Sequence, residues 1–223
     1  MGPTSNVSSR RELRPQGQRT RARLLAAGLQ ILAERGYAAS RVDDVVRIAE
    51  TSRGTFYLYF KDKEDLFRAL AHAAADDMAA LADDLGPIDE GPAGRDELRR
   101  FLDAFYETYE RHGAVIRAWA ENQVDDPALV DLGLDTFSGL AAALVDRLSE
   151  SGTGPVADVD LAATIFLATL ERLVYFATSR PLGLPAGELL DELAGVLHRG
   201  FFGGRVDGLH GVSPRRGARS RRC

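Results

Sequence analysis

The 223-residue sequence lacks the chemistry that marks several common classes of protein. Its single cysteine, Cys223, can form neither an internal disulfide nor a cysteine-based zinc site, which excludes a disulfide-rich fold and a zinc finger. The four histidines are scattered, and we find no His-Glu-x-x-His motif, Gly-x-Ser-x-Gly turn or phosphate-binding glycine loop. The sequence therefore predicts no catalytic residue, no metal site and no cofactor, and it favours a reducing, cytoplasmic setting.

Long apolar runs are also missing from the sequence. The most apolar stretch, residues 161–177, contains Glu171 and Arg172, whereas a membrane-spanning helix needs about 18 or more apolar residues. Residues 1–15 carry arginines but no apolar segment after them, so they do not resemble a secretory signal. We therefore expect a soluble protein with no membrane partner.

Charge is distributed unevenly along the chain, although the net charge is only −5. Residues 1–63 contain 12 Lys and Arg against 6 Asp and Glu, and residues 204–223 contain 6 against 1. Residues 64–203 contain 10 Lys and Arg against 26 Asp and Glu. A basic head on an acidic body is expected if the head meets a polyanion and the body does not, although charge also fluctuates along any chain.

Apolar residues recur every three or four positions, and no strand-like alternation is bounded by turn signals. The sequence therefore predicts an all-α fold. The first helix is expected over about residues 20–35, with Gly36 in the usual position for a helix C-terminus. Gly28 lies inside this helix and predicts a close crossing with a second helix.

Two short helices follow, over about residues 42–49 and 53–59. Ser40, with an acidic residue three positions later, is expected to cap the first of them. Thr51 and Ser52 can cap the second, which leaves only a few residues for the turn between the helices. This pattern indicates a helix-turn-helix.

A long fourth helix is expected after Asp62, which with Asp65 can form a reciprocal cap. Glycine and proline then break the chain over residues 86–94. Further helices are expected at about residues 95–111, 113–122, 127–150, 158–179 and 186–202.

The second short helix of the pair presents a face suited to DNA. Phe56 and Phe60 stand four residues apart and should face inward, which leaves on or near the outer face Arg53, Gly54, Thr55, Tyr57 and Tyr59. Arg53 can donate to guanine O6 and N7, Gly54 allows close approach to the bases, and Thr55 offers a hydroxyl and a methyl. The two tyrosines can give hydroxyls to phosphates, although core packing is the alternative for either ring.

Neighbouring residues can bind the phosphate backbone. Lys63 opens the fourth helix, where the helix dipole and free N–H groups favour an anion. Ser40 and Arg41 can bind a phosphate in the same way at the start of the short helix that they precede, and for Ser40 this role is compatible with capping. Basic residues of the N-terminal arm and the C-terminal tail can enter the minor groove, release counterions or simply be solvated: Arg10, Arg11, Arg14, Arg19, Arg21, Arg23, Arg215, Arg216, Arg219, Arg221 and Arg222.

Three stretches of this region carry a family resemblance. Residues 24–37, 42–45 and 52–66 read LLAAGLQILAERGY, VDDV and SRGTFYLYFKDKEDL. Their glycine, aromatic and lysine positions resemble the DNA-binding domain of the tetracycline-repressor-like (TetR) transcriptional regulators, over about a fifth of the chain. Glu50 departs from the pattern because the family usually has glycine there, which affects the geometry of the turn and adds a negative charge near the interface.

The resemblance implies an N-terminal three-helix DNA-binding domain followed by a helical body that binds a small molecule and dimerises. The domains expected are a disordered basic arm 1–18, a helix-turn-helix DNA-binding domain 19–63, a ligand-binding and dimerisation domain 64–203 and a disordered basic tail 204–223. The DNA-binding residues expected are Ser40, Arg41, Ser52, Arg53, Gly54, Thr55, Tyr57, Tyr59 and Lys63. The expected function is a dimeric repressor that binds double-stranded DNA at a palindromic operator and is released by a small-molecule effector.

Residues in the body are less diagnostic. For an apolar effector cavity we expect walls from Phe105, Tyr109, Trp119, Asn122, Phe137 and Thr169. The last two helices carry apolar residues more widely than one buried stripe requires, which indicates a four-helix homodimer interface or a broad monomer core. The interface residues expected are Leu161, Ile165, Phe166, Leu173, Leu189, Leu193, Val196 and Leu197.

Three alternatives stay open at this point. An architectural DNA-binding protein would share the helix-turn-helix but need no effector. An activator would differ only in its effect on transcription. An enzyme has almost no support from the motifs, and an assay panel would discriminate it from a regulator.

Overall fold

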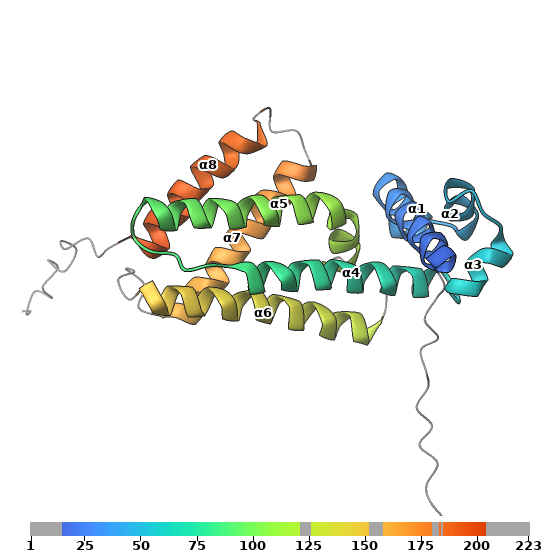
Figure 1. Cartoon of the computed structure of the whole chain (residues 1–223), viewed down its shortest axis with the longest axis horizontal. Coiled ribbons are helices and arrows are strands. Elements are labelled where there is room, and N and C mark those ends of the chain that lie inside the picture. The colour runs from blue at the N-terminus through green and yellow to red at the C-terminus, as the bar shows by residue number, and fades with distance from the viewer. Residues whose placement is uncertain (1–14, 121–125, 152–157, 180–182, 184, 204–223) are drawn as a thin grey trace, which may run out of the picture. The chain divides into compact units, whose positions relative to one another are not determined.

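A computed structural model of the chain describes residues 15–120, 126–151, 158–179, 183 and 185–203. Every regular element in these residues is helical, which confirms the predicted all-α fold (Figure 1). The elements are α1 (Pro15–Ala39), α2 (Val42–Ile48), α3 (Arg53–Tyr59), α4 (Lys63–Asp84), α5 (Pro92–Ala120), α6 (Pro127–Ser151), α7 (Val159–Ser179), α8 (Ala186–Leu197) and a π-helical turn η1 (His198–Phe202).

The chain divides into two compact units. Unit 1 comprises Met1–Ala80 and Glu107–Phe137, and unit 2 comprises Leu81–Tyr106 and Ser138–Cys223. This grouping differs from the boundary expected near residue 63, because α4 is one continuous helix and its first turns pack with the N-terminal helices. The functional domains 19–63 and 64–203 stay a prediction.

The core of unit 1 lies where α1, α2 and α3 gather around the start of α4 (Figure 1). The apolar stripe of α1 is buried at Leu24, Ile31 and Leu32, as the helical spacing predicts. A Cβ atom added to Gly28 would lie 2.8 Å from Leu66 Cδ2 of α4. The close helix crossing expected at this glycine is therefore confirmed.

Helix α1 begins at Pro15, about five residues before the expected start. Residues 15–23 are mainly polar and give no apolar periodicity, but proline is favourable at the first helical position. Residues 15–18 thus belong to a helix and not to a disordered arm, whereas the rest of the arm and the tail 204–223 lie outside the described residues. The helical conformation is interrupted at Gly36, whose φ of 72° and ψ of 170° turn the chain as expected.

Side-chain caps fix the starts of α3 and α4. The Ser52 hydroxyl accepts from the backbone N–H of Thr55 at 3.1 Å, as predicted for the start of α3. At α4, Asp62 accepts from the N–H of Asp65 at 2.7 Å while Asp65 accepts from the N–H of Lys61 at 2.9 Å. The cap predicted from Asp62 is therefore confirmed, whereas the return bond of Asp65 reaches the N–H of Lys61 and not that of Asp62. These bonds set where each helix begins.

The middle of the chain folds more continuously than expected. The predicted break after residue 111 is wrong, because α5 is one helix that includes Gly113. A glycine inside a helix costs about 1 kcal/mol relative to alanine, which is too little to end a helix that packs well elsewhere. By contrast, α6 and α7 match their predicted ranges within one residue.

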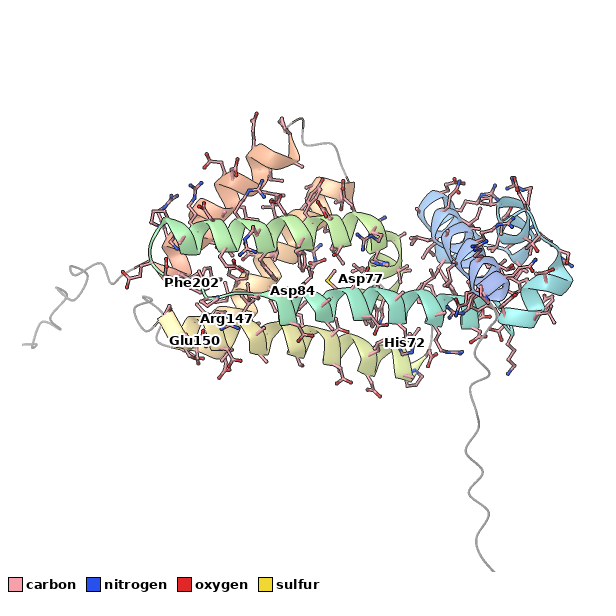
Figure 2. The ribbon with its side chains drawn as sticks, in the orientation of Figure 1. His72, Asp77, Asp84, Arg147, Glu150 and Phe202 are labelled. Carbon is pink, nitrogen blue, oxygen red and sulfur yellow. The ribbon has the colours of Figure 1, made fainter. Side chains whose placement is uncertain are left out.

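Unit 2 has its own buried core. Helices α7 and α8 contribute Phe166, Leu170, Val174, Leu190 and Leu197, all of them buried. The final segment expected as one helix to residue 202 changes to π-helix at η1, where Phe202 is fully buried. At the C-terminal end of α6, Arg147 and Glu150 form an ion pair of 2.6 Å (Figure 2).

Two helices, α6 and α7, are long and apolar enough to cross a membrane by length and composition alone. This differs from the expectation that no run qualifies, because their charged residues are sparse enough for a window of 18 residues to contain at most two. Core helices of soluble proteins meet the same criteria, so these two helices are weak evidence for a membrane.

Candidate nucleic-acid interface

Helix α3 is anchored by two aromatic rings on its inner side. Phe56 has no exposed surface, Phe60 is buried, and their ring centroids lie 5.7 Å apart. Both rings belong to the core of unit 1, as predicted from their spacing. Because this anchor fixes the rotation of α3, it also decides which residues face outward.

The outward face of α3 contains polar and apolar side chains. Arg53 and Gly54 are exposed, Thr55 is half-buried, and the exposed fraction of Tyr57 is 56%. Sequence reasoning missed Leu58, which at 80% is the most exposed of the large hydrophobic residues in the described part of the chain. Its position two residues after Phe56 was the available signal, since residues two apart lie on nearly opposite sides of a helix.

Tyr59 does not share this outward face. It is half-buried and packs against the core of unit 1, because it lies three residues after Phe56 on the inner side of the helix. The prediction that both tyrosines are on the outside is therefore corrected: Tyr57 points outward and Tyr59 takes the alternative role in packing.

Arg53 is engaged by a carboxylate that the sequence reasoning did not connect with it. Its Nε donates to Asp43 Oδ1 and its Nη2 donates to Asp43 Oδ2, which joins α2 to α3 by a bidentate ion pair. Both side chains remain more than half exposed. The hydrogen bond from Arg53 lowers the pKa of Asp43 below its usual value, so the carboxylate is ionised at neutral pH.

The turn between α2 and α3 has a strained backbone at Glu50. Its φ of 48° is the only positive φ of a non-glycine residue among the described positions. Arg23 of α1 donates through Nη2 to the carbonyls of Ala49 and Glu50, the latter at 3.2 Å. The departure from glycine thus has the local geometric consequence that the sequence suggested.

The start of α2 is built differently from the prediction. Its N-cap is Arg41, with no side-chain cap, and the Ser40 hydroxyl instead donates to the carbonyl of Gly36 at 2.7 Å. The capping role predicted for Ser40 is therefore wrong, because this hydroxyl closes the turn at the end of α1. Arg41 is exposed, as a phosphate contact requires.

Lys63 at the start of α4 is half-buried and already has partners. Its Nζ donates to the carbonyl of Tyr37 at 3.2 Å and lies 4.1 Å from the centroid of the Tyr37 ring. The Tyr37 hydroxyl in turn donates to Glu64 Oε1 at 3.1 Å, and burial followed by the charge of Glu64 raises the pKa of Tyr37. Lys63 therefore fastens α1 to α4, and its remaining N–H donors are the ones that a phosphate can use.

Comparison with known proteins agrees with this geometry. A family model described as "Bacterial regulatory proteins, tetR family" matches residues 24–70, which include α2, α3 and the start of α4. A second, described as "Tetracyclin repressor-like, C-terminal domain", matches residues 95–199. Together they span about two thirds of the chain. The chain belongs to the TetR family.

Relatives of this TetR-family chain are named as transcriptional regulators. It is 29% identical over 206 residues to the HTH-type transcriptional regulator EthR of Mycobacterium tuberculosis, covering 87% of this chain and 92% of EthR. It is 37% identical over 90 residues to the transcriptional regulator AcuR of Cereibacter sphaeroides, covering 40% of this chain and 41% of AcuR. The chain is accordingly a transcriptional regulator with a helix-turn-helix DNA-binding region.

Solved structures share its fold. A TetR-family regulator from Streptomyces coelicolor has a TM-score of 0.64 at 21% identity, covering 81% of this chain and 79% of that one. The regulator FadR from Bacillus subtilis, solved in complex with stearoyl-CoA, has a TM-score of 0.62 at 20% identity, covering 80% and 98%. At these identities the likeness concerns the fold alone.

The residues predicted to surround an effector have unequal environments in this TetR-family chain. Phe105 and Tyr109 are buried, whereas Phe137 and Thr169 are exposed, and the Thr169 hydroxyl donates to the carbonyl of Ile165 within its own helix. Trp119 is half-buried and donates through Nε1 to the carbonyl of Leu129 at 2.5 Å. Asn122 lies outside the described residues, and none of this set lines the hollow beside Tyr37 and Leu66 or the one beside Leu25 and His72.

The predicted dimer residues divide into three groups within unit 2. Phe166, Leu193 and Leu197 are buried in the core of the chain, so their assignment to an interface surface is corrected. The side chains of Leu173 and Leu189 are half-buried. The remaining three, Leu161, Ile165 and Val196, are each about half exposed or more.

Proposed function

We propose that this TetR-family chain is a repressor that binds a palindromic operator as a homodimer and is released by a small-molecule effector. The observation that carries the proposal is the outward face of α3, where Arg53, Tyr57 and Leu58 stand exposed on a helix fixed by buried Phe56. A helix exposed in this way fits the major groove, whose width admits an α-helix.

Contacts on this face divide into base and backbone contacts. Arg53 is assigned to guanine, Gly54 to close approach, and Leu58 to an apolar group such as the methyl of thymine. Tyr57 and Arg41 are assigned to phosphates, together with the free donors of Lys63. The hydroxyl oxygens of Ser52 and Thr55 lie 3.0 Å apart in a hydrogen bond, so the two side chains would contact a phosphate together.

The exposed apolar residues of unit 2 support self-association. Leu161 and Ile165 stand one turn apart on α7, and Val196 is exposed on α8. Large exposed apolar side chains at helical spacing are costly in water and favour burial against a second copy. In a symmetric dimer on successive major grooves the two α3 helices would lie about 34–36 Å apart, or a multiple of that distance.

Release by an effector requires two states with different affinities for the ligand. An effector that binds more tightly to a conformation with the wrong α3 spacing lowers the affinity of the protein for its operator. By linkage, the operator lowers the affinity for the effector by the same factor. Stearoyl-CoA, which is bound in FadR of Bacillus subtilis, gives one chemical class with which to begin a screen. We extend to this chain a cytoplasmic location and the absence of enzymatic activity, both in keeping with its relatives.

DNA binding is tested by selecting duplexes from a random library with the purified chain and measuring affinities at two salt concentrations. Arg53→Ala should relax base preference at one position of each half-site, by about tenfold. Lys63→Ala should weaken binding to every duplex and flatten the salt dependence. Failure to enrich any sequence would contradict operator binding, and an unaltered preference in Arg53→Ala would contradict the assigned orientation of α3.

Effector release is tested separately with stearoyl-CoA and a small-molecule library. An effector should raise the melting temperature of the free protein and reduce its affinity for the operator. Free CoA, which lacks the stearoyl group, is the control compound. A regulator independent of effectors would show neither response. An activator would require DNA binding to increase transcription from a reporter promoter, which a repressor decreases.

A further inference from the structure

The ion pair between Asp43 and Arg53 occupies only one edge of the guanidinium. Arginine carries five N–H donors, and the two facing Asp43 come from Nε and Nη2. The other edge, formed by Nη1 and the second hydrogen of Nη2, points away from the carboxylate. That edge offers two parallel donors, which is the number that guanine O6 and N7 accept in the major groove.

We propose that Asp43 is a positioning residue, which orients the Arg53 guanidinium so that its free edge can read a guanine. The inference rests on the proposed DNA-binding function and adds to it a residue that determines specificity. A long exposed arginine would otherwise sample many rotamers and lose their entropy on binding DNA. A bidentate carboxylate reduces that loss, because it fixes the plane of the guanidinium before the base arrives.

The charge of Asp43 makes the proposal distinguishable from a simple electrostatic role. A carboxylate on a DNA-facing surface repels phosphates and cancels the charge of Arg53, so it weakens sequence-independent attraction. Its removal should therefore strengthen non-specific binding while it weakens discrimination for guanine. A residue that only repels DNA would change specific and non-specific affinity together and leave their ratio unchanged.

The experiment uses the full chain and the duplex selected in vitro, and it begins by locating the guanine that Arg53 reads. Each guanine is replaced in turn by 7-deazaguanine, which lacks the N7 acceptor. The relevant position is the one where this replacement weakens the wild type but not Arg53→Ala. The discrimination ratio is then the dissociation constant for the 7-deaza duplex divided by that for the unmodified duplex.

Asp43→Asn is the test variant and Glu50→Gln is its matched control. The Glu50 side chain is exposed in the turn before α3 and does not contact Arg53, so Glu50→Gln removes one negative charge without disturbing the ion pair. Circular dichroism and thermal melting of both variants confirm that the helix-turn-helix is folded. The double variant Asp43→Asn/Arg53→Ala completes a cycle that isolates the coupling between the two residues.

We expect Asp43→Asn to reduce the discrimination ratio about tenfold and to raise affinity for an unrelated duplex, whereas Glu50→Gln raises that affinity with the ratio unchanged. In the Arg53→Ala background, Asp43→Asn should leave the ratio unaltered. A ratio that stays at the wild-type value in Asp43→Asn would overturn the positioning role alone. The absence of any guanine read by Arg53 would overturn both the positioning role and the assignment of Arg53 to guanine. Failure to select any duplex would overturn the proposed function as well.

Discussion

Replacing Glu50 by glycine is expected to stabilise the helix-turn-helix. Glu50 occupies the left-handed region at a φ of 48°, where an L-residue brings its Cβ close to the following carbonyl. Its own side chain forms only a long, exposed pair with Arg23 at 3.9 Å, which contributes little. The two bonds from Arg23 reach backbone carbonyls and therefore survive any substitution at residue 50.

The size of the effect follows from two opposing backbone contributions. The left-handed conformation costs a residue with a Cβ roughly 1–2 kcal/mol. Glycine avoids this cost, but it loses about 0.5–1 kcal/mol of the advantage because an unfolded chain with glycine at this position is more flexible. The difference between Glu50→Gly and Glu50→Ala should therefore be about 0.5–1 kcal/mol in favour of glycine, since both variants remove the same carboxylate.

Urea denaturation followed by circular dichroism measures this difference directly. In a chain of this length, a free-energy difference of about 0.5–1 kcal/mol makes the melting temperature of Glu50→Gly about 1–4 °C higher than that of Glu50→Ala. Because the comparison is between two variants that both lack the charge, electrostatic changes cancel. If Glu50→Ala proved as stable as Glu50→Gly, the strain assigned to this turn would be refuted.

Three further predictions concern separate contacts. Ser52→Ala removes the cap of α3 and should lower the free energy of unfolding by about 1 kcal/mol in urea titrations, and an unchanged value would contradict the cap. Replacing one operator thymine by deoxyuridine should cost the wild type about 0.8 kcal/mol of binding free energy, and Leu58→Ala should show no such loss. If no thymine replacement weakened binding of the wild type, the contact with the methyl would be ruled out. Asp77 on α4 (Figure 2) accepts hydrogen bonds from His112 and Arg111, which lower its pKa below the usual 3.8. Its stabilisation is therefore present above about pH 4 and lost at lower pH, so acid titrations of wild type and Asp77→Asn should converge there, whereas a constant difference would contradict the role of Asp77.

Local chemistry made much of the fold predictable. The spacing of Phe56 and Phe60 identified the inner side of α3, and the Asp62 and Asp65 pair located the start of α4. Gly28 predicted a close crossing, which α4 provides through Leu66. The aromatic pair and the cap each join residues that are three or four positions apart in the sequence. The close crossing depends on glycine, the one residue type without a side chain.

Interactions between elements were harder to foresee. Ser40 has the spacing of a cap, but its hydroxyl donates back to the carbonyl of Gly36, and α2 begins after Arg41 with no side-chain cap. The pairing of Arg53 with Asp43 depends on the angle between α2 and α3, which periodicity does not specify. For the same reason, an apolar list could not separate the buried Phe166 from the exposed Ile165 beside it.

The central claim is that two copies of α3 enter successive major grooves of one operator. Hydroxyl-radical footprinting of the full chain on its selected duplex tests it most directly. The account predicts two equivalent protected segments related by a dyad, with centres separated by one helical turn or a whole multiple of it, about 34–36 Å per turn. A single protected segment without a dyad, or protection that does not depend on sequence, would contradict the account.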